Sequence, residues 1–143
     1  MITDAQLRCS ENQSLTGAAA TTTSTNTIDL LSKNSNIGIG ARRRAVVTVG
    51  TAFTGGTSVQ ALYVQSDNAD LSSSDTLATG TAVVDASATV GAVLMDIIVP
   101  NNTKRYVGFK YVTVGTHTTG TIGFAGIVSD TDQQPYVPAN LGR

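Results

Sequence analysis

Apolar residues occupy nearly every second position in three stretches of the second half of the chain, residues 93–99, 107–111 and 122–128. Because successive side chains of a strand point to opposite faces, this period of two predicts β-strands that each bury one face. The expected strands span Ala92–Pro100, Arg105–Val114 and Thr121–Val128. The residues expected in their shared core are Met95, Ile97, Val107, Phe109, Ile122 and Phe124.

The first half of the chain predicts further strands. Arg44–Val49 is mostly β-branched and stops at Gly50–Gly56, which predicts a hairpin leading into a second strand at Thr57–Gln65. Gly115–Gly120 predicts a similar loop. Weaker strand signals occur at Thr25–Leu31 and Ala82–Asp85, and we expect one or two more strands between Ile2 and Thr22.

Together these segments predict an all-β fold, an antiparallel β-sandwich or jelly roll of about eight short strands. No stretch shows a sustained helical period, and no linker or repeat of fixed period divides the chain. We therefore expect a single β-sandwich domain over residues 1–143. Some of the strands are apolar on both faces, so we expect a loop or a partner chain to cover one of these faces.

The composition changes the picture mainly through its low charge. Only 13% of the 143 residues are charged, although 41% are hydrophobic. The surface must therefore consist largely of Thr, Ser, Asn, Gln and Gly, which suits a protein partly hidden in a larger assembly. Nine basic and ten acidic residues give a net charge of -1, which argues against general nucleic-acid binding. No apolar run is long enough to cross a membrane.

The sequence offers few groups for catalysis. The one histidine, His117, is expected to be a solvated turn residue, and Cys9 a small buried filler. A single cysteine and the absence of a secretory signal fit a protein made in a reducing cytoplasm. The acidic clusters at 67–70 and 130–132 lack the spacing of a calcium loop and predict turns. We expect no enzyme activity, no cofactor and no metal.

Basic residues are concentrated in two places. Arg42, Arg43 and Arg44 stand directly before a predicted strand, and Lys104 and Arg105 precede a later one. These are either solvated strand starts or a patch that pairs with carboxylates of a protein partner, since guanidinium groups suit bidentate contacts. If the triplet is extended, Arg43 must point away from its two neighbours.

Several segments, in order along nearly the whole chain, resemble one family: Met1–Leu7, Gln13–Thr16, Ser24–Leu30, Asn36–Gly40, Lys104–Tyr111 and Thr119–Val128. The family is that of the small capsid cement, or decoration, proteins of tailed bacteriophages of the Bordetella-phage type. The resemblance implies a jelly-roll fold, a homodimer, and a structural role on the exterior of the virion, where the protein would clamp neighbouring major capsid protein subunits.

With this resemblance, the basic residues become candidates for contact with the capsid: Arg42, Arg43, Arg44, Lys104 and Arg105. The expected partners are the major capsid protein and a second copy of the chain, with no nucleic acid and no membrane. The alternative is a β-sandwich carbohydrate-binding or host-attachment module. That function would need exposed aromatic side chains, and the four tyrosines are the main candidates.

Overall fold

The computed structural model describes residues 2–33 and 43–129. Its elements are β1 (Ile2–Ser14), β2 (Thr21–Thr23), β3 (Ile28–Asp29), β4 (Arg43–Ser66), β5 (Asp75–Thr79), β6 (Val83–Val84), the 3-10 turn η1 (Asp85–Ser87), β7 (Val93–Ile98) and β8 (Tyr106–Ser129). All strand pairs are antiparallel and belong to one sheet of eight strands. The predicted all-β fold is confirmed.

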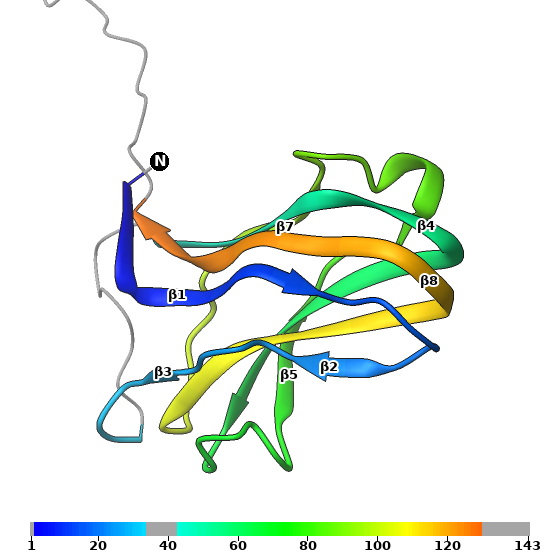
Figure 1. Ribbon diagram of the computed structural model, residues 1–143. Helices are drawn as coiled ribbons and strands as arrows, with labels where there is room; N and C mark the ends of the chain where they lie inside the picture. The colour runs from blue at the N-terminus through cyan, green and yellow to red at the C-terminus, as the bar shows by residue number, and fades with distance from the viewer. Residues whose placement is uncertain (1, 34–42, 130–143) are drawn as a thin grey trace, which may run out of the picture.

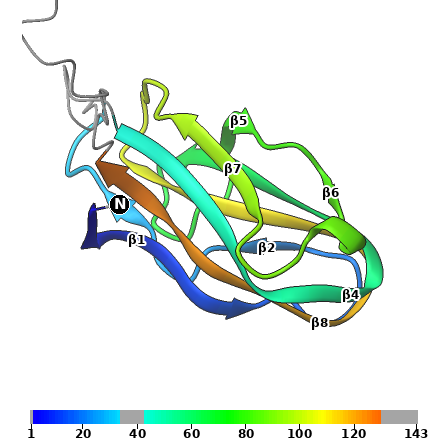
Figure 2. The same cartoon turned by 90° about the horizontal axis from the view of Figure 1, so that it is seen from above.

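Two strands of 24 residues each, β4 and β8, form the frame of the molecule. They pair with each other from Arg43–Ser129 at one end to Ser66–Tyr106 at the other. Figures 1 and 2 show both strands running to one end of the molecule, bending and running back, so that the sheet folds over into two layers. We call the end with the bends the closed end, and the end where β4 and β8 begin and finish the open end.

The shorter strands extend each layer on both sides. In one layer β1 pairs with the second half of β8, and β7 pairs with the first half of β4. In the other layer β2 and β3 pair with the first half of β8, whereas β5 and β6 pair with the second half of β4. Each layer therefore ends on edge strands that depend on the β4–β8 pair.

The predicted hairpin at Gly50–Gly56 and the predicted loop at Gly115–Gly120 are wrong, because the chain bends at both places without leaving the strand. Thr57–Gln65 does not pair with Arg44–Val49; both segments pair with β8. The bends show as register shifts between Thr48 and Ser58, and Gly55 and Gly115 adopt φ angles of +87° and +85° there. Glycine turn signals mark a corner in a strand as readily as a hairpin, because both require backbone conformations that other residues avoid.

The core lies between the two layers. Tyr63 of β4 and Phe109 of β8 pack edge to face, with ring centroids 5.3 Å apart. Of the six residues expected in the core, Met95, Val107, Phe109 and Ile122 are buried, and Ile97 and Phe124 are half-buried.

The prediction that Phe124 lies in the core is wrong, because the ladder is irregular next to it. The pairing shifts between Thr48–Phe124 and Val49–Ile122, which inserts a residue into β8. Such a bulge reverses the alternation beyond it. Ala125 is therefore buried on the core side, where the simple period of two placed Phe124.

The core position of Phe109 predicts a large loss of stability on truncation. Phe109→Ala should lower the free energy of unfolding by about 3–5 kcal/mol, because it leaves a cavity beneath Tyr63. Val114→Ala, at an exposed position of the same strand, should change it by less than about 0.5 kcal/mol. Urea unfolding of both variants measures the difference, and equal stabilities would contradict this description of the core.

Candidate functional site

The basic residues singled out from the sequence lie at the open end, where β4 begins and β8 begins (Figure 1). Arg42 lies outside the described residues. Arg43 is half-buried, and its guanidinium donates to the Ser129 hydroxyl of β8 at 3.2 Å. Arg44 reaches the other neighbouring strand, β7, where its Nε lies 2.6 Å from Asp96 Oδ1. Arg43 and Arg44 thus contact different neighbouring strands. As consecutive residues of an extended segment, they also point to opposite faces of the sheet.

The second basic group is also held within the molecule. Lys104 Nζ lies 2.8 Å from the Asp75 carboxylate, and Arg105 binds both carboxylate oxygens of Asp29 at 2.7 Å. The hydrogen bond from Arg105 is the main reason that the pKa of Asp29 is lowered. Since exposed pairs of this kind contribute about 0–1 kcal/mol, a partner carboxylate could replace the internal one at little net gain. These residues suit the rim of a contact surface better than its centre.

His117 is not the solvated residue that the sequence predicted. Its side chain is buried at the closed end, with Nε2 2.9 Å from Asp85 Oδ1, while the N–H of Gly56 donates to the other carboxylate oxygen of Asp85. The ring also packs edge-on against Phe53, with centroids 5.4 Å apart. The backbone of His117 exchanges two hydrogen bonds of 2.9 Å with Gly17. His117 therefore ties the η1 segment and the end of β1 to the bent strands.

The cysteine and the acidic cluster at 67–70 are parts of the fold rather than reactive sites. Cys9 is buried, and burial raises the pKa of its thiol to about 12, so it is not a thiolate nucleophile at neutral pH. Asp70 accepts a hydrogen bond from the Ser72 N–H at 2.9 Å, which is the turn geometry expected for the 67–70 cluster. The 130–132 cluster lies outside the described residues. Residues 2–33 and 43–129 contain no group of three or more potential metal ligands.

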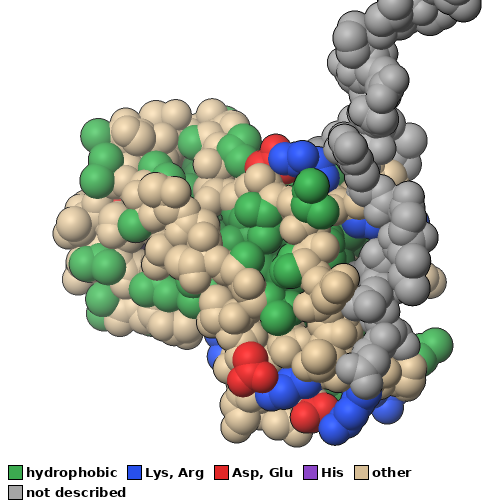
Figure 3. Space-filling view, turned by 180° about the vertical axis from the view of Figure 1, so that it is seen from behind, with side chains coloured by type: hydrophobic (Ala, Val, Ile, Leu, Met, Phe, Trp, Pro, Cys, Tyr) green, Lys and Arg blue, Asp and Glu red, His purple; other side chains and the backbone are tan. Residues whose placement is uncertain are grey.

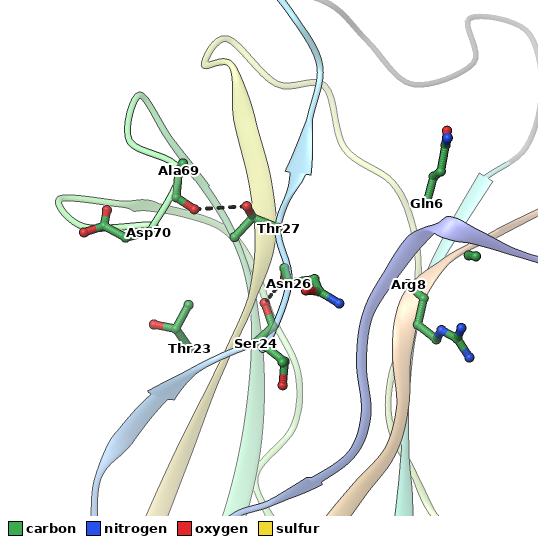
Figure 4. Close-up of a pocket in the computed structure, with 10 residues that line it drawn as sticks. Gln6, Arg8, Thr23, Ser24, Asn26, Thr27, Ala69 and Asp70 are labelled. Carbon is green, nitrogen blue, oxygen red and sulfur yellow. Dashed lines mark hydrogen bonds between the residues drawn. The ribbon is translucent and has the colours of Figure 1, made fainter.

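A polar groove of about 620 Å³ lies between β1, the connection from β2 to β3, and the loop before β5 (Figure 4). Its lining residues are Ala5, Gln6, Arg8, Thr23, Ser24, Thr25, Asn26, Thr27, Ala69 and Asp70. Several of their polar groups serve the fold: Thr27 Oγ1 donates to the Ala69 carbonyl, and Ser24 Oγ donates to that of Asn26.

The polar groove lacks the aromatic platform that a carbohydrate-binding module would need. Tyr63 and Tyr111 are fully buried, and Tyr106 is half-buried with the Arg105 guanidinium 5.1 Å above its ring. Tyr136 lies outside the described residues. No observation on the described residues therefore favours the carbohydrate-binding alternative.

The described residues thus define a protein of the all-β sandwich class. The model of the Bbp16 family matches residues 9–127, and the chain belongs to this family. The family name is of the kind given to Bordetella phage proteins, which is consistent with a phage structural protein. No curated protein matches the chain. None of the helices in the described part of the chain could span a membrane.

The buried histidine predicts a specific loss of stability. His117→Ala removes one of the two hydrogen-bond partners of the Asp85 carboxylate, so the free energy of unfolding should fall by about 1–3 kcal/mol. Thr116→Ala, at the exposed neighbouring position, serves as the control and should leave stability unchanged within about 0.5 kcal/mol. Thermal and urea unfolding measure both; an unchanged midpoint for His117→Ala would show that the pair contributes nothing.

Proposed function

We propose that this protein is a capsid cement protein, a structural component of a phage virion that binds the outer surface of the assembled shell and stabilises it. The observation that carries the proposal is the match of the Bbp16 family model over residues 9–127. The low content of charged residues supports the proposal, because a protein whose surface is partly covered in an assembly needs fewer charged side chains to remain solvated.

The mechanism is non-covalent and additive. Each copy would bury one surface on neighbouring subunits of the major capsid protein. Once one contact has formed, the other contacts of the same molecule form at a high effective concentration, so the overall affinity rises. A sandwich framed by two strands that run through both layers suits this role. A contact surface held on paired strands is preorganised, and preorganisation limits the entropic cost of association.

The proposed function is binding alone, and it requires no catalysis, no cofactor and no metal. The two side chains best suited to catalysis have structural surroundings. His117 is buried against Asp85, and the Cys9 thiol is protonated at neutral pH. Nucleic acid and membrane are not among the proposed partners, in keeping with the near-zero net charge.

We further propose that the protein forms a homodimer with two-fold symmetry, in which the same surface of each copy makes the contact. A dimer would double the number of shell contacts per unit and so raise avidity. Sedimentation equilibrium at tens of micromolar should give about twice the chain mass of 14.7 kDa. A monomer at that concentration, both free and when released from shells, would contradict the dimer.

The function is tested by mixing the purified protein with isolated, undecorated shells of its phage and measuring co-sedimentation and resistance of the shells to heating. Wild-type protein should bind and raise the temperature of shell disruption. The triple change of Arg42, Arg43 and Arg44 to Ala should leave folding intact but weaken binding at moderate salt, because rim ion pairs are individually weak and add up over many copies. Arg8→Ala, which removes a half-buried arginine of β1 outside both basic groups, is the control and should bind normally.

A further inference from the structure

Arg43 is the first residue of β4, at the open end, and it shares a strand face with core residues. Residues two apart in a strand lie on the same face, and Ala45 and Val47 are fully buried in the core. Across the ladder Arg43 pairs with Ser129, two residues beyond Ile127, which also belongs to the core. The Arg43 side chain therefore begins on the core side of the sheet, where the two layers meet solvent.

The guanidinium group of Arg43 is incompletely paired. Its Nη1 donates to the Ser129 hydroxyl at 3.2 Å, whereas its Nε is buried and has no hydrogen-bond acceptor. Within residues 2–33 and 43–129, the ion pairs of the structure do not include Arg43. This half-buried cation has thus lost part of its hydration without gaining a counterion from those residues.

The other basic residues described at the open end already have carboxylate partners. Their pairs include Arg44–Asp96, Lys104–Asp75 and Arg105–Asp29. In the view from behind (Figure 3), acidic and basic side chains lie next to one another at one end of the face. A new carboxylate would have to displace an internal one from these residues, and such an exchange gives little net gain. At Arg43 a carboxylate would add an ion pair without breaking a described one.

A second copy of the chain is a poor source of this carboxylate, because the acidic side chains that the structure describes have partners of their own. They are Glu11 with Arg8, Asp29 with Arg105, Asp67 with Lys33, Asp70 with the Ser72 N–H, Asp75 with Lys104, Asp85 with His117 and Asp96 with Arg44. The side chains of Asp4, Asp130 and Asp132 are not among those described. The described charges thus favour a different molecule as the source.

We propose that Arg43 is the residue through which this protein recognises the shell, and that its guanidinium binds a carboxylate of the major capsid protein. The planar guanidinium suits a carboxylate, and the bond to Ser129 fixes its direction. Because Arg43 is already half-buried, part of its dehydration precedes binding, so a carboxylate gains more here than at a fully solvated arginine. The inference rests on the proposed function and names the chemistry of its principal contact.

This assignment divides the arginine triplet by role. Arg43 binds the partner, whereas Arg44 connects β4 to β7 through Asp96. The loss of shell binding expected for the triple variant should therefore come mainly from Arg43. A partly buried ion pair is screened less by salt than an exposed one, so the contribution of Arg43 should persist at moderate salt.

The test compares two replacements of Arg43 that have similar length and different charge. In co-sedimentation with undecorated shells, Arg43→Met should raise the concentration for half-saturation at least about ten-fold over wild type. Arg43→Lys keeps the charge and should bind at least about three-fold more tightly than Arg43→Met. Arg44→Met should raise that concentration by at most about three-fold, because it loses an exposed pair. Arg8→Met is the matched control outside both basic groups and should bind like wild type.

The melting temperature of the isolated protein supplies a readout that does not need shells. Arg43→Met replaces an incompletely paired, half-buried cation with an apolar side chain, so it should melt at or above the wild-type temperature. A residue that serves only the fold would show the opposite result. A clear drop in melting temperature would therefore overturn the assignment of Arg43 to the partner.

The binding results separate this inference from the proposed function. If wild-type protein fails to bind shells, the proposed function fails and this inference with it. If wild type binds and the triple variant binds weakly, but Arg43→Met binds like wild type, the inference is overturned while the function stands. It is also overturned if Arg44→Met loses as much as Arg43→Met, or if Arg43→Lys binds no better than Arg43→Met.

Two further measurements identify the molecule that carries the carboxylate. The combined changes Asp4→Asn, Asp130→Asn and Asp132→Asn should leave shell binding unchanged, and a loss as large as that of Arg43→Met would place the carboxylate on this chain. Sedimentation of Arg43→Met should give the same mass as wild type. Dissociation of a dimer with shell binding intact would assign Arg43 to the contact between two copies and overturn the inference.

Discussion

The structure depends on the pairing of β4 with β8 through a shared bend. The ladder runs from Arg43–Ser129 to Ser66–Tyr106, so each half of one strand finds the corresponding half of the other. Every other strand attaches to one of these two, and several are too short to persist without them: β3 and β6 have two residues each. Because the bend passes both strands from one layer to the other, the same ladder also brings the two core faces together.

Charge is distributed unevenly over this frame. At the open end Arg44, Lys104 and Arg105 are each paired with a carboxylate from a different element, which connects the chain segments that meet there. At the closed end the surface is formed largely by threonines, and Thr54 bonds to both Thr118 and Thr119 across the bend. His117 and Asp85 supply the polar contact beneath it. The low overall charge thus leaves most of the surface at the closed end neutral.

This arrangement bears on how such a protein could hold a larger structure together. Affinity for a surface comes mostly from a desolvated centre, and charged groups at the margin contribute mainly to the rate and salt dependence of binding. Basic residues are conspicuous in a sequence with few charges, yet Arg44, Lys104 and Arg105 each have a carboxylate partner within the chain.

The sequence by itself determined the fold class and the strands around Val107 and Phe109, since these follow from local period and backbone preference. It also determined that Arg43 and Arg44 point apart. Only the tertiary structure decided that the chain bends within β4 and β8 where the sequence predicted a hairpin and a loop, and that Phe124 leaves the core. It alone decided which carboxylates the arginines meet and that Asp85 holds His117 from 32 residues away. The physical reason is that strand partners and ion pairs are chosen between segments far apart in the chain, and no local pattern records that choice.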